Sequence, residues 1–195
     1  RFFKNHGLFK LKNRPQWYTV TNRSRAYVNK ITNKISGEIF KNYKVEKITR
    51  TDENVRMLIE NEYLDYDHVI LASHADQTLS ILDEPSDQEK NILSKFSYVK
   101  NNAILHSDER LMPKRKRAWS SWNFLQDLEN DQFSLTYWMN RLQKIIKKEN
   151  YFVSINPYKE PNNIIDKTIF AHPIFNQQLI NAQKKLGKIQ GVQNT

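Results

Sequence analysis

Alternating hydrophobic and polar positions predict a short strand meander in the first half of the chain. After Gly37 the chain is expected to become extended, and Val55, Met57 and Ile59 alternate with polar residues as a half-buried strand does. Residues 68–72 are instead apolar without alternation, which is typical of a strand covered on both faces. The small residues and the helix start that follow have the geometry at which nucleotide cofactors bind in open α/β sheets.

The second half of the chain, up to about residue 172, is expected to form mainly strands. In one of them Phe133, Leu135 and Tyr137 alternate with the residues between them. A short helix over residues 140–148 is predicted to interrupt the strands and to turn Ile146 inward. The predicted strands cover residues 98–106, 118–124, 133–139, 151–156 and 168–172.

Helical spacing and capping residues predict short helices around these strands. Thr21 or Asn22 is expected to cap a helix whose apolar positions Ala26, Tyr27 and Ile31 fall on one face.

Two further helices are indicated by their ends. Ser86 followed three residues later by Glu89 predicts a capping box. A helix over residues 176–186 is expected to stop at Gly187, and residues 188–191 are interpreted as the approach to another strand. This order of strands and helices predicts an α+β architecture with two interleaved domains.

The composition supports a folded protein and removes several kinds of chemistry. Of the 195 residues, 38% are hydrophobic and 12% aromatic, which is enough to build a core. Cysteine is absent, so disulfides, thiolate metal sites and a cysteine nucleophile are excluded, and a cytoplasmic location is the default expectation. No window approaches eighteen apolar residues, so no transmembrane helix is predicted, while peripheral membrane contact stays open. The 4 glycines lie far apart, so they cannot form a glycine-rich phosphate loop.

The chain is basic, with 31 Lys and Arg against 21 Asp and Glu and a formal charge of +10. Such a balance favours nucleic acid or anionic lipid as a partner, so a basic binding module is an alternative interpretation. The excess is spread along the chain, however, and its densest run, residues 114–117, is better interpreted as a solvated loop between strands. No nucleic-acid partner is therefore expected. His106 and Asp108 have no third ligand in the sequence around them, so no metal site is expected either.

Specific aromatic and basic strings run in order along nearly the whole chain. They are FFKNHGL at 2–8, RPQW at 14–17, VILASHADQ at 69–77, LHSD at 105–108, LMP at 111–113, AWSSWN at 118–123, TYWMNRLQ at 136–143 and HPIF at 172–175. These strings resemble a bacterial group of predicted NAD/FAD-binding proteins within the flavin amine-oxidase and phytoene-desaturase superfamily.

The resemblance implies an FAD-dependent oxidoreductase, in which FAD accepts a hydride from a C–N or C–C bond of the substrate. In that superfamily a strand with a Val-x-x-Ile pattern contacts the adenosine part of FAD, and Val45 and Ile48 match it here. Val45 is therefore a predicted cofactor contact, and Ala72 and Ser73 are predicted to lie near the cofactor. A flavin-binding protein without turnover is a further alternative.

The resemblance also implies an aromatic substrate pocket beside the flavin, for a small-molecule or lipid substrate. His6, Trp122, Tyr137 and Trp138 are its predicted residues, since aromatic side chains on adjacent strands can form one wall. Amine, polyene and fatty-acyl substrates are all compatible with such a pocket. The residues indicate no catalytic group, electron acceptor or oligomeric state.

By the same resemblance the chain divides into pieces of two domains. Residues 1–20 belong to the substrate side, 21–83 to a Rossmann-like FAD domain, 84–175 to a mixed or antiparallel substrate-domain sheet, and 176–195 to a helix that returns to the FAD domain. The Gly-x-Gly-x-x-Gly segment and the C-terminal Gly-rich segment of the family are not in this chain, and Asn22 and Arg23 replace a paired glycine. The chain is therefore interpreted as an interior fragment of a flavoenzyme, unable to bind FAD tightly alone.

Overall fold

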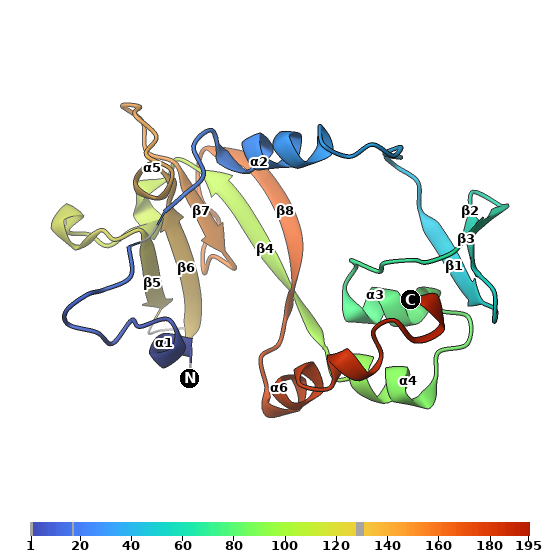
Figure 1. Cartoon of the computed structure of the whole chain (residues 1–195). Helices are drawn as coiled ribbons and strands as arrows, with labels where there is room; N and C mark the ends of the chain where they lie inside the picture. Colours follow the sequence, from blue (N-terminus) through green and yellow to red (C-terminus); the bar gives the residue numbers. More distant parts are fainter. Residues whose placement is uncertain (1, 17, 128–130) are drawn as a thin grey trace. The chain divides into compact units, whose positions relative to one another are not determined.

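The structure, a computed structural model, describes residues 2–16, 18–127 and 131–195 (Figure 1). It contains two compact units, each assembled from two stretches of sequence. Unit 1 comprises Arg1–Glu38 and Ala103–Lys167, and unit 2 comprises Ile39–Asn102 and Thr168–Thr195. Helices and antiparallel ladders make up the fold, which confirms the predicted α+β class. The assignment of segments to a flavin domain and a substrate domain stays a prediction.

Unit 1 is built around a sheet with the strand order β5-β6-β7-β4-β8. Its ladders β5–β6, β6–β7 and β7–β4 are antiparallel. The strands are β4 (Tyr98–His106), β5 (Trp122–Asp127), β6 (Gln132–Trp138), β7 (Phe152–Ile155) and β8 (Ile164–Pro173), and β4 and β8 continue across the boundary into unit 2. The helical segments are α1 (Phe2–Asn5), α2 (Arg23–Thr32), η1 (Glu109–Leu111), η2 (Lys116–Ala118) and α5 (Met139–Leu142).

The core of unit 1 lies on one face of this sheet. Phe152 is fully buried and is the cross-strand partner of both Trp138 and His106, so these three side chains share a face. The Trp119 ring meets Trp138 and Phe152 edge-on, with centroids 5.2 and 5.7 Å apart, and Met112 completes the cluster. Aromatic edge-to-face packing of this kind stabilises the core beyond the burial of area alone.

Unit 2 combines a three-stranded antiparallel meander with short helices. The meander has the order β1-β2-β3, and a register shift between Val45 and Lys47 marks a bulge in β1. The elements are β1 (Val45–Arg50), β2 (Val55–Ile59), β3 (Glu62–Tyr66), α3 (Ala75–Ile81), α4 (Asp87–Leu93), α6 (Gln177–Gln183), η3 (Leu186–Lys188) and η4 (Val192–Asn194). Both the meander and the predicted alternation of its second strand are confirmed, since Val55 and Ile59 are buried.

The core of unit 2 joins the meander to α3. Ile48, Val55 and Leu82 form the buried cluster, and a single parallel bridge links Ile48 to Leu82. Val69 and Leu71 pack against this cluster from the segment that precedes α3.

Residues 68–72 do not form the strand that their apolar run predicts. Among the described residues no strand pairs with them, and Ile70 is 94% exposed. The Val69 N–H donates instead to the carbonyl oxygen of Asn194 at 3.0 Å. A strand needs a neighbouring strand to pair its N–H and C=O groups, and residues 68–72 have no such partner among the described residues.

The predicted helix over residues 140–148 ends after one turn, and the inward placement of Ile146 is wrong because its side chain is 99% exposed. The Asn140 side chain replaces the missing helical bonds. Its amide donates to the Glu149 carbonyl at 2.9 Å, and its oxygen accepts from the Tyr151 N–H at 2.7 Å. Lys144 then adopts a φ of 47°, which turns the chain out of the helix.

The predicted helix is confirmed as α2, but its predicted N-cap residue makes no capping bond and its apolar side is largely exposed. Asn22 occupies the N-cap position with a φ of 63° and makes no side-chain capping bond. Tyr27 and Ile31 are 47% and 57% exposed, so the apolar side of α2 faces solvent while Ala26 is half-buried.

Three further predicted element ends can be compared with the structure. In α4 the predicted Ser86–Glu89 capping box is present. The strand expected from residue 118 begins at Trp122 because η2 occupies the preceding residues. α6 ends at Gln183, so Gly187 is not its cap, and 3-10 turns rather than a strand follow it.

Candidate functional site

Unit 2 contains a cavity of about 550 Å³. A volume of this size lies within the roughly 300–1,000 Å³ range of small-molecule and cofactor pockets. Its walls come from the segment before α3, from α3 and α4, from the start of β4 and from the C-terminal turns. The lining residues are Val69, Ile70, Leu71, Ser73, Ala75, Thr78, Leu82, Glu89, Leu93, Phe96, Tyr98, Leu186, Ile189, Gln190, Gly191 and Thr195.

The start of α3 brings hydroxyl groups to this cavity. The Ser73 and Thr78 hydroxyl oxygens lie 2.8 Å apart, and Thr78 is buried. The Ala75 N–H, a free donor at the helix start, donates to the Tyr98 hydroxyl at 3.0 Å. The Tyr98 ring also stacks on the His74 ring, with centroids 4.4 Å apart and planes 9° from parallel. These contacts fix one polar edge on a largely apolar wall.

Glu89 is the carboxylate in the wall, and Arg50 neutralises it. The two Arg50 Nη atoms lie 2.5 and 2.9 Å from the two Glu89 oxygens, and both side chains are less than 10% exposed. Burial alone would raise the pKa of Glu89, but hydrogen bonds from Arg50 and Ser86 outweigh it and lower the pKa. Arg50 also donates to the Thr195 hydroxyl at 3.2 Å. Glu89 is therefore a structural anion and not a free general base.

The donor set of the cavity fits the ring and sugar portion of a nucleotide cofactor. Apolar side chains supply surfaces for a planar ring, and the Ser73, Thr78 and Tyr98 hydroxyls supply polar contacts. Neither lysine nor arginine appears among the described lining residues, so the cavity offers no clamp for a diphosphate. The residues thus suit adenosine and leave the phosphates without a cationic partner.

The three predicted cofactor residues occupy different places around this cavity. Ser73 lines it. Val45 does not, but it packs on the same Ile48 cluster as Leu71. Ala72 is exposed and is not a lining residue. Their contact with a cofactor stays a prediction.

The structure brings together two of the four predicted substrate residues. Trp122 and Tyr137 are cross-strand partners whose rings meet edge-on at 6.0 Å. Trp138 points to the opposite face, where its Nε1–H donates to Asn150 at 3.0 Å. His6 is exposed in the turn after α1. A substrate role for these residues stays a prediction.

His106 and Asp108 are committed to the hydrogen-bond network of unit 1. The His106 Nε2 lies 2.8 Å from the Ser154 hydroxyl, and its Nδ1 accepts from the Asp108 N–H at 3.1 Å. The Asp108 carboxylate binds the Arg110 guanidinium and the Asn162 N–H, which hold its pKa well below the ordinary range. Within the described part of the chain, no group of three or more His, Asp or Glu side chains could hold a metal ion.

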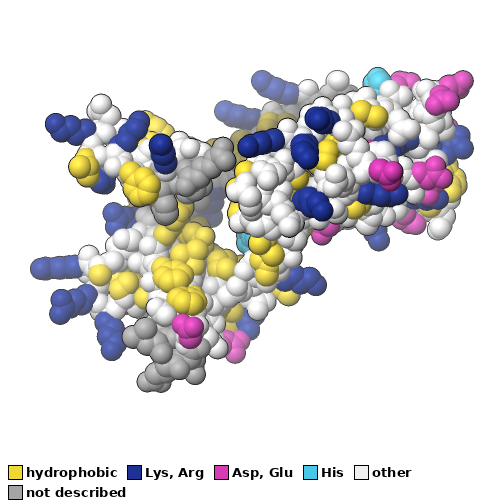
Figure 2. Space-filling model, turned by 90° about the horizontal axis from the view of Figure 1, so that it is seen from below, with side chains coloured by type: hydrophobic (Ala, Val, Ile, Leu, Met, Phe, Trp, Pro, Cys, Tyr) yellow, Lys and Arg dark blue, Asp and Glu magenta, His cyan; other side chains and the backbone are white. Residues whose placement is uncertain are grey.

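The basic run at residues 114–117 forms an exposed loop that includes η2. Lys116 pairs with Glu109 at 3.0 Å and lies 5.3 Å above the Trp119 ring. Lys and Arg side chains are also spread over much of the visible surface, as Figure 2 shows, with hydrophobic side chains gathered in patches between them.

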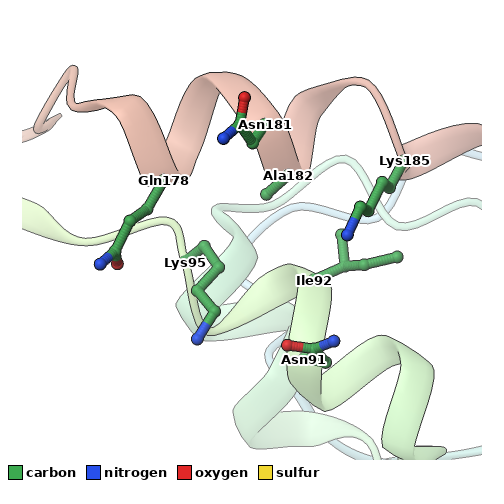
Figure 3. Close-up of a pocket in the computed structure, with 7 residues that line it drawn as sticks. All are labelled: Asn91, Ile92, Lys95, Gln178, Asn181, Ala182 and Lys185. Atoms are coloured by element: carbon green, nitrogen blue, oxygen red, sulfur yellow. The ribbon is translucent and has the colours of Figure 1, made fainter.

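A second, smaller depression of about 280 Å³ lies between α4 and α6 (Figure 3). Side chains from the two helices and the residues just after them line it, namely Asn91, Ile92, Lys95, Gln178, Asn181, Ala182 and Lys185. It is a polar notch between packed helices, and it contains none of the predicted site residues.

Sequence reasoning missed Tyr98, Thr78 and the C-terminal turns as parts of the larger cavity. No local signal identifies them, because each is brought to the cavity from a different stretch of the chain. The sequence does predict two lining residues, Ser73 through the family resemblance and Glu89 through the Ser86–Glu89 capping box, which is a structural signal.

In the ranges that the structure describes, no helix has the length and apolar character needed to cross a bilayer.

Comparisons with known proteins identify similar folds but no family. No protein-family model and no curated protein matches the chain. A fatty acid isomerase from P. acnes that produces CLA has a similar structure, with a TM-score of 0.57, 13% identity, and coverage of 88% of this chain and 45% of that one. A putative protoporphyrinogen oxidase from Exiguobacterium sp. 255-15 is similar at a TM-score of 0.57 and 11% identity, over 97% of this chain and 50% of that one. The chain thus spans half or less of the length of these solved proteins, and identities this low establish a shared fold alone.

Proposed function

We propose that this chain is part of an FAD-dependent oxidoreductase and that the unit 2 cavity holds the adenosine portion of FAD. The observation that carries the proposal is the placement of Ser73 and the start of α3 on the wall of a 550 Å³ cavity. This is the position at which the family resemblance expects the cofactor. The similar fold of a putative protoporphyrinogen oxidase, a redox enzyme by name, supports the same class.

Within this function the chain's own residues bind and orient the cofactor. Val69, Leu71 and Phe96 exclude water from a ring, and the Ser73 and Thr78 hydroxyls orient a sugar. FAD, when bound, supplies hydride acceptance. The diphosphate requires backbone N–H donors from a glycine-rich segment, because the described cavity residues include no cation for it. A cytoplasmic location stays a prediction.

The first experiment uses the longest reading frame that contains this chain. Expression should give a folded protein from which heat releases FAD, identified by its absorbance and chromatographic mobility. A folded, colourless protein would count against the proposal.

A second experiment uses the chain itself, with AMP as a probe of the adenosine site. Titration calorimetry should detect weak AMP binding, and Ile70→Asp should reduce the affinity by about tenfold because it places a negative charge at the cavity. Ile146→Asp is the matched control, since Ile146 is 99% exposed and lies outside the cavity. Equal AMP affinities for the two variants would count against this site.

A further inference from the structure

The excess positive charge of the chain lies almost entirely in residues 1–37, the basic segment, all of which belongs to unit 1. This segment contains nine Lys and Arg and neither Asp nor Glu. The remaining residues contain 22 Lys and Arg against 21 Asp and Glu, so they are almost neutral. The expectation of an excess spread along the chain is therefore wrong. A local excess of one sign attracts partners of the opposite charge.

The described part of the basic segment is neither neutralised nor covered. None of its Lys and Arg side chains forms an ion pair with a described carboxylate. None of residues 4–16 and 18–37 is buried. Apolar side chains are exposed among the cations, and Leu11 and Tyr18 are 89% and 88% exposed. The segment therefore presents positive charge and apolar surface to the same solvent.

Helix α2 places its apolar side chains in one sector. With about 100° of rotation per residue, Tyr27, Val28 and Ile31 fall within a sector of about 100°. These side chains are 47%, 44% and 57% exposed. The half-buried residues of α2, Ala26 and Thr32, lie outside this apolar sector. The apolar sector of α2 is therefore turned towards solvent and not towards the rest of unit 1.

Cations border the apolar sector on both sides. At the same rotation per residue, Lys30 lies about 60° before Tyr27, and Arg25 lies about 60° beyond Val28. Long basic side chains in such positions can extend their charged ends outwards while the apolar sector is buried. With 10 residues α2 is about 15 Å long, which is too short to cross about 30 Å of hydrocarbon but suits a helix that lies in a membrane surface.

An anionic bilayer is the partner that suits both features of α2. Nucleic acid would neutralise the cations, but its phosphate backbone would leave Val28 and Ile31 in water. An apolar protein surface would cover those two side chains but would take Arg25 and Lys30 out of water without counter-ions. The surface of an anionic membrane offers acyl chains to the apolar sector and phosphate head groups to the cations that border it.

We propose that unit 1 binds the surface of an anionic phospholipid membrane through α2. The apolar sector lies at the boundary between head groups and acyl chains, and the cations of the basic segment bind lipid phosphates. This inference concerns unit 1, and it is independent of the oxidoreductase function proposed for the cavity of unit 2.

The first test measures how the chain partitions onto vesicles by sedimentation. The partition coefficient for phosphatidylcholine vesicles that contain phosphatidylglycerol should exceed that for pure phosphatidylcholine by about tenfold or more. Arg25→Gln/Lys30→Gln should lower it by about tenfold. Lys90→Gln/Lys184→Gln is the matched control, because it removes the same charge from exposed positions of unit 2 and should leave partitioning close to that of the wild type.

A second pair of variants tests the apolar sector without changing the charge. Val28→Ser/Ile31→Ser should lower the partition coefficient by about tenfold or more through the loss of apolar contact. Serine has nearly the helix propensity of valine and isoleucine, so α2 should be retained. Ile70→Ser/Ile146→Ser is the matched control, since both isoleucines are more exposed and lie outside the basic segment. Circular dichroism and thermal unfolding must show that each variant remains folded.

Hydrogen exchange locates the contact independently of any variant. Amides of residues 25–35 should exchange more slowly when vesicles are present, because a bound helix opens less often. Protection confined to other segments would overturn the inference.

Three further outcomes would also overturn it. They are equal partitioning onto neutral and anionic vesicles, unchanged partitioning of Val28→Ser/Ile31→Ser, and binding of single-stranded DNA by a chain that does not sediment with vesicles. The last of these outcomes would assign the basic segment to nucleic acid.

Discussion

Arg50 and Glu89 form a buried bidentate ion pair that joins β1 to α4 in unit 2. Their side chains are 4% and 6% exposed, and Glu89 also accepts from the Ser86 N–H at 2.7 Å as part of the capping box. Each side chain neutralises the charge of the other and is its hydrogen-bond partner. Removal of either one would leave a buried charge without a counter-ion.

Replacing Arg50 should therefore destabilise the protein strongly. Arg50→Met leaves the Glu89 carboxylate buried without its cation, and removal of one partner of a buried pair costs about 3–5 kcal/mol. The free energy of unfolding in urea measures this loss. Lys47→Met is the control, because the Lys47–Asp83 pair is solvent-exposed and should change stability little. Similar losses in both variants would contradict the buried role of Arg50.

Two serines on β6 and β7 should respond oppositely to alanine. The Ser134 hydroxyl is buried and has no hydrogen-bond partner among the described residues. Ser134→Ala should thus leave the unfolding free energy unchanged or raise it, because a desolvated hydroxyl is removed. Ser154 lies between His106 and Thr136, at 2.8 and 2.7 Å, so Ser154→Ala should cost about 1–3 kcal/mol. Equal effects in thermal or urea unfolding would refute this difference.

The folded state should keep His106 neutral, with its proton on Nε2. The Asp108 N–H occupies Nδ1, which leaves Nε2–H to donate to the Ser154 hydroxyl. Burial lowers the pKa of His106, and the Asp108 carboxylate offsets only part of this effect. Stability is therefore full above about pH 6.5, the ordinary pKa of histidine, and declines as the pH falls from there towards the folded-state pKa.

Urea unfolding at pH 7.5 and pH 5.5 measures this dependence. His106→Gln keeps a donor for Ser154 but cannot be protonated, so it should show a smaller loss of stability than the wild type between the two pH values. A wild-type loss no larger than that of the variant would show that another group is responsible. A nitrogen-15 spectrum of the imidazole identifies the tautomer independently.

Asn140 should control access to the loop after α5. Asn140→Ala removes the side-chain bonds to the Glu149 carbonyl and the Tyr151 N–H, so the loop should open more often. Trypsin should then cleave faster after Lys144, Lys147 and Lys148. Cleavage after Lys41, which lies in unit 2, is the internal control and should keep its wild-type rate.

Local signals in the sequence were sufficient for most elements. The strand predicted at residues 98–106 is β4 itself, and the Ser86–Glu89 box starts α4 as expected. Both depend on residues within a few positions of one another. The strand predicted at residues 68–72 is wrong because an apolar run indicates that its side chains tend to be buried. It does not identify a neighbouring strand that could pair with the run.

The candidate site was predictable only where a family pattern reached it. Ser73 was named in advance, whereas Tyr98 and Gly191 come to the cavity from distant stretches of the chain. The sheet of unit 1 shows the same limit. Alternation in β6 separates Tyr137 from Trp138, but it does not say which face a loop will cover. Coverage is a property of tertiary packing.

The hydrogen bond from Arg50 to Thr195 joins residues 145 positions apart within unit 2. A ribosome that has finished the β1–β3 meander must still synthesise all of unit 1's second stretch before the remaining part of unit 2 emerges. The meander and the helices that pack on it are therefore expected to stay incompletely folded until residues 168–195 are available. Unit 1 can fold before that point. Contacts between stretches so distant in sequence slow folding, so unit 2 should close only after residues up to Thr195 have been synthesised.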